Sequence, residues 1–179
     1  MSGEEGLGSA GVPAVGDEDW VRGPDDARLV LIEYADFECP FCATLELRLS
    51  VLDGPAAPRG VRRVFRHFPV RSAHPRALAA ACAAEAAGRQ GRFWEMHSLL
   101  FSAPAQLEDP HLWERAERLG LDVDRFDADR RSEEVAARVR RDFTSGVRAG
   151  VVTTPTVFVD GHAFHGDELR ALVDALLRG

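Results

Sequence analysis

The stretch of sequence that decides the fold is Leu29-Val-Leu-Ile-Glu-Tyr-Ala-Asp-Phe-Glu-Cys-Pro-Phe-Cys42. It opens with four apolar residues in a row, which is typical of a strand covered by helices on both faces of its sheet. From Cys39 onward the pattern predicts a helix, because Pro40 suits a first helical turn and leucines then recur at helical spacing. A further strand is expected over residues 61–68, so this part predicts a parallel strand–helix–strand unit.

The pattern changes after this unit. Residues 75–148 carry apolar side chains at helical spacing, and we expect several helices there. β character returns after Gly150, where residues 156–159 and 163–165 predict two strands joined by a hairpin turn. A last helix is expected from about Asp167. The predicted fold class is therefore α/β, in the order βαβ, helical block and ββα.

Composition limits the partners. The chain has 179 residues, which suits one domain: residues 17–179, after a mobile tail over residues 1–16. The net charge is −7, but five acidic residues and no base lie in the first 20 residues, so the rest is nearly neutral. That balance argues against a nucleic-acid partner. No apolar run approaches the roughly 20 residues of a membrane span. The N-terminus lacks the features of a secretory signal, so we expect no membrane partner and a cytoplasmic protein; a secreted or periplasmic one is expected only if a leader has been removed.

The spacing Cys39-Pro-Phe-Cys42 indicates the chemistry. Cys39 lies where strand sequence gives way to helix sequence, so the N–H groups and the dipole of the helix favour its thiolate. Cys42 lies one turn deeper on the same face, and we expect its thiol to be buried and protonated. An exposed Cys39 that attacks and a Cys42 that resolves the mixed disulfide are what disulfide exchange requires. Between them, Pro40 donates no N–H and Phe41 brings no charge, while an exposed Phe41 would contact apolar peptide.

Glu33 is unusual because it directly follows the apolar run of the first strand, where a carboxylate is costly without a task or a partner. It precedes Cys39 by six residues, on a strand that leads into the helix, so it could lie beneath the two cysteines. A buried carboxyl with a raised pKa would take the proton from Cys42 as that thiol attacks. The alternative is an acid at the strand edge that faces water.

Other polar residues have plainer explanations. Zinc is the main alternative for the cysteine pair, with His162 and His165 as further ligands, but these histidines are too closely spaced for the usual pattern. Cys82, in an alanine-rich segment, is expected to be a small core residue. His67, His74 and His97 have no spacing that demands a metal, so we expect no metal and no cofactor. The arginines at 62–63 and 138–141 are expected to lie on solvated faces.

Three segments together resemble the DsbA-like thioredoxin-fold oxidoreductases. They are the segment around the cysteine pair, and two further stretches: Gly91-Arg-Phe-Trp-Glu-Met-His97 and Gly150-Val-Val-Thr-Thr-Pro-Thr-Val-Phe-Val-Asp-Gly161. The segment Asp19-Trp-Val-Arg-Gly-Pro-Asp-Asp-Ala27 also fits. The resemblance runs in order from about Asp17 to the C-terminus, and it rests on the combination of segments rather than on the cysteine spacing alone.

The resemblance implies a thioredoxin fold with a helical insertion over about residues 71–145. It implies that Cys39 is the nucleophile, Cys42 the resolving cysteine and Glu33 the acid beneath them. Pro155 would be a cis proline that faces the cysteines, whereas generic X–Pro statistics, with about 5–6% cis, favour trans. The residues that would contact substrate are Pro40, Phe41, Thr154 and Pro155. Strong oxidases of this family carry His where this chain has Phe41, so we expect a less oxidising pair.

The main hypothesis is a thiol–disulfide oxidoreductase that acts on protein or small-molecule thiols and disulfides, with a redox partner that the sequence does not identify. A second hypothesis is a thioredoxin-fold binding module whose cysteines are not catalytic. A third is a glutathione-dependent transferase or isomerase that uses only Cys39. Reactivity of the pair separates the first two, and activity that survives the loss of Cys42 would favour the third.

Overall fold

The computed structural model describes residues 11–53 and 60–178. Five strands and seven α-helices follow one another along these residues: β1 (Trp20–Arg22), β2 (Leu29–Ala35), α1 (Pro40–Leu49), the 3-10 turn η1 (Ser50–Asp53), β3 (Val61–His67), α2 (Ala77–Gly88), α3 (Phe93–Ser102), α4 (Asp109–Arg118), α5 (Val123–Arg130), α6 (Glu133–Arg148), β4 (Thr156–Val159), β5 (His162–Phe164) and α7 (Gly166–Arg178).

The strands form one sheet in the order β1-β3-β2-β4-β5. β2 and β3 pair in parallel across α1, whereas β1 and β4 pair antiparallel to their neighbours, as does β5. The βαβ unit and the closing ββα unit therefore share one sheet, which confirms the predicted fold class. β1 was not predicted, because three residues are too few to show an alternating pattern.

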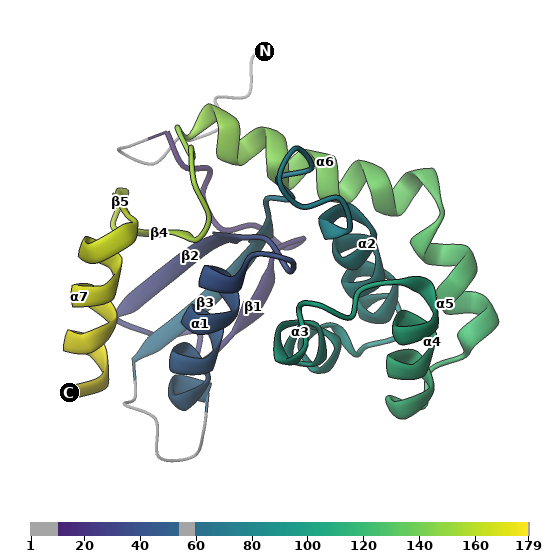
Figure 1. Cartoon of the computed structure of the whole chain (residues 1–179). Helices are drawn as coiled ribbons and strands as arrows, with labels where there is room; N and C mark the ends of the chain where they lie inside the picture. The colour runs from purple at the N-terminus through teal and green to yellow at the C-terminus, as the bar shows by residue number, and fades with distance from the viewer. Residues whose placement is uncertain (1–10, 54–59, 179) are drawn as a thin grey trace, which may run out of the picture.

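The two faces of β2 pack against different layers, because successive side chains of a strand point to opposite faces. Leu31 lies in a cluster with Leu49 of α1 and Val173 of α7. Tyr34 faces the other way, where it packs against Phe68, the residue after β3, and Phe158 of β4. Figure 1 shows α1 and α7 beside the sheet, and α6 running across from the other helices of the helical block toward the sheet. Glu33 shares its face with Leu31, so the fold directs it toward the side that carries α1.

The helices α2 to α6 form the predicted insertion, and they extend over residues 77–148 rather than about 71–145. Most of the alanines of α2 are buried, and their small side chains let neighbouring helices approach closely. The side chains of Asp122 and Ser132 accept hydrogen bonds at the starts of α5 and α6, as expected of N-caps. Within the two described ranges, no helix combines the length and the apolarity that a membrane crossing needs.

The structure differs from the prediction of a mobile tail over residues 11–16. The guanidinium of the buried Arg66 donates hydrogen bonds to the carbonyl oxygens of Pro13 (3.0 Å) and Ala14 (3.1 Å), and it pairs with Asp19. Val12 is buried in the cluster around Tyr34. These contacts hold the segment against the body of the protein. The first ten residues of the predicted tail lie outside the described residues.

Candidate active site

Cys39 lies at the N-terminus of α1, where the sequence predicted it. It is the N-cap residue, with extended backbone angles (φ −77°, ψ 119°), and Pro40 occupies the first turn. The Cys39 N–H donates to the carbonyl oxygen of Asp36 (3.1 Å), and the Cys39 carbonyl oxygen accepts from Ala43 N–H (3.1 Å). The sulfur therefore lies at the end of the helix where unpaired N–H groups and the dipole favour a negative charge.

The two thiols have unequal acidity. The hydrogen bond from Cys42 is the largest influence on Cys39 and, together with bonds from backbone groups of α1 and against the effect of burial, it lowers the pKa of Cys39 to about 6. Burial is the largest influence on Cys42, and with the charges of Cys39 and Glu33 it raises the pKa of Cys42 well above 9. Near neutral pH, Cys39 is thus mainly thiolate while Cys42 keeps its proton.

Cys39 is less accessible than the sequence suggested. We expected an exposed attacking thiol, but the residue is only 3% exposed, while Cys42 is fully buried. The cover comes from the loop before β4, where the Thr154 carbonyl oxygen lies 3.5 Å from Cys39 Sγ and accepts a hydrogen bond from it when the sulfur is protonated. Sequence could not show this cover, because the two segments are 115 residues apart.

The loop before β4 and α1 enclose a groove beside the cysteines. The Thr154–Pro155 peptide bond is cis. The groove has a volume of about 310 Å³, and its lining includes Phe41, Thr154 and Pro155, with Leu169 and Val173 of α7. Phe41 is 74% exposed at its rim. The groove therefore shares Thr154 with the cover over Cys39, and it adjoins the residue pair between the two cysteines through Phe41.

Glu33 is buried beneath the helix that carries the cysteines. It is 3% exposed and lies between Phe65 of β3 and Val157 of β4 in the sheet register. Its Oε2 is 3.6 Å from Arg63 Nη2, while Oε1 has no hydrogen-bond partner among the described residues. Burial, opposed by the charge of Arg63, raises the pKa of Glu33 to about 7. The alternative of a strand-edge acid facing water is therefore wrong.

Arg63 is a site residue that sequence reasoning missed, because we expected the 62–63 pair to be solvated. It is 3% exposed, and its guanidinium contacts Glu33, Glu46 and Asp53. We call these four residues, with Arg22 bound to Asp53, the Arg63 cluster. A signal was present in the sequence: two consecutive residues of a strand point to opposite faces, so one of the two arginines had to face inward.

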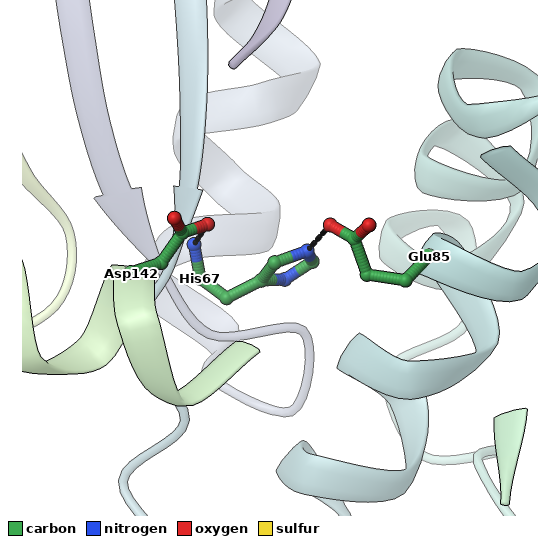
Figure 2. A group of neighbouring side chains, drawn as sticks. All are labelled: His67, Glu85 and Asp142. Carbon is green, nitrogen blue, oxygen red and sulfur yellow. Dashed lines mark hydrogen bonds and ion pairs between the residues drawn. The ribbon is translucent and has the colours of Figure 1, made fainter. Parts of the chain in front are cut away.

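His67 belongs to a second buried polar group, which Figure 2 shows. His67 Nε2 is 2.7 Å from Glu85 Oε1, which also accepts a hydrogen bond from Trp20 Nε1 at 2.7 Å. The His67 N–H donates to Asp142 Oδ2 at 3.1 Å, and Arg138 binds the other oxygen of Asp142. We call His67, Glu85 and Asp142 the His67 tie, since they connect β3 to α2 and α6.

The His67 tie holds the residue types of a metal site, with one potential ligand atom from each residue within 4.8 Å of the others. Most of its polar atoms bind one another, Trp20 or Arg138, whereas the buried Nδ1 of His67 has no hydrogen-bond partner among the described residues. Burial alone would raise the pKa of Glu85, but the hydrogen bond and charge of His67, with the charge of Arg138 and the hydrogen bond from Trp20, outweigh it and lower that pKa. The group therefore suits a structural connection between the sheet and the helical block.

The zinc alternative gains no support from the geometry. Over the part of the chain that the structure describes, Cys39 and Cys42 are not grouped with His162 and His165 as potential ligands. Cys82 is buried in α2, and burial raises its pKa to about 11, as a core cysteine requires. His97 is also buried, on α3, among the rings of Phe37, Phe65 and Trp94.

Known proteins match almost the whole chain. A protein named Na(+)/H(+) antiporter NhaA 3 from Salinispora tropica is 44% identical over 183 residues, which cover 99% of this chain and 27% of that protein. Na(+)/H(+) antiporter NhaA from Herminiimonas arsenicoxydans is 43% identical over 164 residues, which cover 89% of this chain and 25% of that protein. The chain thus spans about a quarter of the length of these curated relatives.

Solved structures share the fold. A thioredoxin-like oxidoreductase from Silicibacter pomeroyi has a TM-score of 0.76 at 23% identity, with 92% of this chain and 95% of that chain covered. BdbD from Bacillus subtilis has a TM-score of 0.72 at 21% identity, with 89% and 92% covered. Alpha-DsbA1 from Wolbachia pipientis has a TM-score of 0.72 at 20% identity, with 90% and 92% covered. The sequence profile of the thioredoxin family matches residues 16–176, and the chain therefore belongs to that family.

Proposed function

We propose that this protein is a thiol–disulfide oxidoreductase that works through Cys39 and Cys42. The observation that carries the proposal is the unequal acidity of the two thiols: the pKa of Cys39 is lowered to about 6, and the pKa of Cys42 is raised. A thiolate that attacks and a protonated neighbour that waits are the two components of disulfide exchange. A binding module would have no need for this difference.

In the first step, the Cys39 thiolate attacks one sulfur of a substrate disulfide. A bond forms between Cys39 Sγ and that sulfur, the disulfide bond of the substrate breaks, and its other sulfur leaves as a thiolate that takes a proton from water. The product is a mixed disulfide between Cys39 and the substrate. The cover over Cys39 by the Thr154 carbonyl must open or shift for this step, because the residue is 3% exposed.

In the second step, Cys42 gives its proton to Glu33 and attacks Cys39 Sγ. The Cys39–Cys42 disulfide forms, the bond to the substrate breaks, and the second substrate sulfur leaves as a thiolate. The substrate has gained two electrons and the cysteine pair has lost them. Glu33 suits this role because it is buried, its pKa is about 7, and its charge is near enough to raise the pKa of Cys42.

The proposed substrates are proteins or small molecules with accessible disulfides. Phe41, at 74% exposed, and Val152, at 86% exposed, present apolar surface beside the groove that contains Thr154 and Pro155. An extended peptide with an apolar residue next to its cysteine would fill this groove. We also propose a cytoplasmic location, where a reducing pool would keep the pair as a dithiol and favour reduction of substrates.

A glutathione-buffered titration of the cysteine pair, run beside an insulin-reduction assay, tests the proposal. Cys39→Ser should abolish reduction, Cys42→Ser should accumulate mixed disulfides, and Cys82→Ser is the matched control that should keep activity. Unchanged turnover in Cys39→Ser would refute the proposal. Full activity in Cys42→Ser would instead favour a glutathione-dependent transferase, and an inert wild-type pair would favour a binding module.

A second proposal concerns a partner. We propose that the chain acts on or beside a membrane antiporter, because relatives named Na(+)/H(+) antiporter are 44% identical over 99% of this chain. The test incubates Cys42→Ser with membrane vesicles that contain such an antiporter, followed by nonreducing electrophoresis and a sodium–proton exchange assay. A trapped adduct, or exchange that differs between the oxidised and reduced chain, supports the proposal. The absence of both effects, relative to Cys39→Ser, would contradict the proposal.

A further inference from the structure

Arg22, on the edge strand β1, is the second arginine of the Arg63 cluster, and the proposed mechanism gives it no task. Its Nη1 donates a hydrogen bond to Asp53 Oδ2 at 2.7 Å, and Nη1 of Arg63 donates to the same oxygen at 2.7 Å. The guanidinium of Arg22 also lies over the ring of Trp94, 4.5 Å from its centroid. These contacts hold Arg22 against the cluster, although its side chain remains 29% exposed.

Arg63 has three carboxylate neighbours at unequal distances. Its Nη2 donates a hydrogen bond to Glu46 Oε2, and its Nη1 donates to Asp53 Oδ2. Glu33 Oε2 lies 3.6 Å from Nη2, which is too long for a normal hydrogen bond. The other oxygen of Glu33, Oε1, is buried and has no hydrogen-bond partner among the described residues. Glu33 is therefore the acid that the cations of the cluster bind least.

The charges of the cluster balance in only one protonation state of Glu33. When Glu33 is protonated, two carboxylates, Glu46 and Asp53, face two guanidiniums, Arg63 and Arg22, so the net charge is zero. When Glu33 is ionised, the cluster carries one uncompensated negative charge, which is costly because most of the group is buried. Without Arg22, that uncompensated charge would be present before Glu33 ionises.

The other titratable groups near the cluster leave this balance unchanged at pH 7. His97 Nδ1 of α3 lies 3.7 Å from Glu46 Oε1, but burial, followed by the charges of the two arginines, lowers the pKa of His97 well below 6.5. Cys42, one turn before Glu46 on α1, keeps its proton because burial raises its pKa. On β4, the residue beside Glu33 is apolar. Glu33 is thus the group whose ionisation changes the charge of the cluster near neutral pH.

We propose that Arg22, acting through Asp53, is a positioning residue that makes Glu33 the carboxyl of the cluster that receives the proton of Cys42. The proposal rests on the proposed function and adds a residue of β1 to its site. Arg22 neutralises Asp53, Arg63 is left to neutralise Glu46, and Glu33 has no cation of its own. When Cys42 attacks, its proton moves to a carboxylate oxygen of Glu33, and the cluster returns to zero net charge.

The first test measures how fast Cys42 resolves a mixed disulfide on Cys39 at a series of pH values, in chains that all carry Cys82→Ser. The probe is dithiobis(nitrobenzoic acid), a disulfide whose second coloured thiolate is released as Cys42 attacks. In the reference chain, the rate should rise with pH to a midpoint near 7, where Glu33 ionises. Arg22→Gln should raise the midpoint by about one unit, so that the rate below the midpoint falls about tenfold.

Two further variants separate the charge of Arg22 from its other contacts. Arg22→Lys keeps the charge and should keep the reference midpoint. Arg62→Gln is the matched control on β3, because its side chain is 25% exposed and is also paired with an aspartate, but points to the opposite face of the sheet from Arg63. It should leave the midpoint unchanged. Equal midpoints in Arg22→Gln and the reference chain would overturn the inference and leave the proposed function standing.

Charge compensation gives a rescue that a merely structural role would not produce. Asp53→Asn removes one negative charge, so the midpoint should fall by about one unit. The double variant Arg22→Gln/Asp53→Asn again has zero net charge when Glu33 is protonated, and its midpoint should return to that of the reference chain. A double variant that stays shifted like Arg22→Gln would overturn the inference. A wild-type pair that exchanges no disulfides would refute the proposed function, and this inference with it.

A second measurement needs no substitution, so it holds even if Arg22→Gln fails to fold. The side-chain carboxyl carbons of Glu33, Glu46 and Asp53 are titrated by NMR in the disulfide form of the wild-type protein, in which the active-site cysteines do not titrate. Glu33 should take up its proton at the highest pH of the three, near 7. A higher midpoint for Glu46 or Asp53 would show that the cluster selects a different acid, and it would overturn the inference.

Discussion

Glu33 and Glu85 are both buried glutamates, yet their carboxyl groups have pKa values shifted in opposite directions. Glu33 lies in the Arg63 cluster, where one guanidinium is divided among three carboxylates and Glu33 is its most distant partner at 3.6 Å. Glu85 lies in the His67 tie, where a single oxygen accepts two hydrogen bonds of 2.7 Å. Figure 2 shows how directly His67 points at that oxygen.

The difference teaches that burial alone does not make a carboxyl reactive. Burial raises the pKa of each glutamate, and the number and distance of partners decide how much of that shift remains. The pKa of Glu33 remains raised, to about 7, so its carboxyl can exchange a proton near neutral pH. Glu85 loses its shift to His67, so it stays ionised and holds β3 against α2. One fold thus places the same residue type in two buried settings that shift its pKa in opposite directions.

The sharpest test of this comparison exchanges each glutamate for glutamine. Glu33→Gln should slow resolution of the mixed disulfide by about 100-fold or more, because the variant cannot accept the Cys42 proton. Glu85→Gln is the matched control, and its resolution rate per folded molecule should equal that of wild type. The measurement is rapid-quench analysis of a preformed mixed disulfide at pH 7. Equal slowing in both variants would remove the distinction between the two sites.

The two cysteines Cys39 and Cys82 should differ strongly in their rate of alkylation. The pKa values of about 6 for Cys39 and about 11 for Cys82 predict very different thiolate fractions at pH 7. Lower intrinsic nucleophilicity of the more acidic thiol offsets part of this, which leaves Cys39 about 100-fold faster. Mass-spectrometric timing of iodoacetamide modification in the folded, reduced protein measures the ratio. Comparable rates would show that Cys82 is not an inert core residue.

Breaking the His67 tie should cost stability rather than activity. Glu85→Ala leaves the buried Nε2 of His67 and the Nε1 of Trp20 without their acceptor. We expect the free energy of unfolding to fall by about 3 kcal/mol, the lower end of the range for a broken buried pair. Denaturant unfolding measures the loss. The alkylation midpoint of Cys39 in the folded variant should stay unchanged, and a shift there would mean that the tie also serves the active site.

The pH dependence of stability should have opposite signs at the two glutamates. Folding raises the pKa of Glu33 from 4.5 to about 7, so its contribution is complete below pH 4.5 and is lost as the pH rises through 7. Wild type should therefore lose up to about 3 kcal/mol relative to Glu33→Gln between pH 4.5 and 8.

The lowered pKa of Glu85 has the opposite consequence. Its contribution is present above its unfolded pKa and is lost as the pH falls through the folded value. Unfolding curves of wild type, Glu33→Gln and Glu85→Gln at several pH values provide the comparison. The same slope in both variants relative to wild type would contradict the assignment.

The sequence by itself determined the order of elements and the position of the cysteine pair at a strand–helix junction. These features depend on neighbours within a few residues in the sequence. They include Cys39 at a strand–helix junction, the N-caps Asp122 and Ser132, and the turn before the last strand. Such local patterns can be predicted from the sequence, since periodicity, capping and helix dipoles act over one or two turns. The acid of the first strand was also visible, because a carboxylate in an apolar run is rare.

The tertiary structure alone decided how those residues behave. Arg63 turned from a predicted surface residue into the partner of Glu33, and Thr154 came to cover a sulfur 115 residues away. The imidazole of His74 lies 2.9 Å from the carboxylate of Asp36, which is 38 residues earlier in the chain. The physical reason is that a pKa and an exposed fraction depend on every charge and atom within several ångströms, whichever part of the chain supplies them.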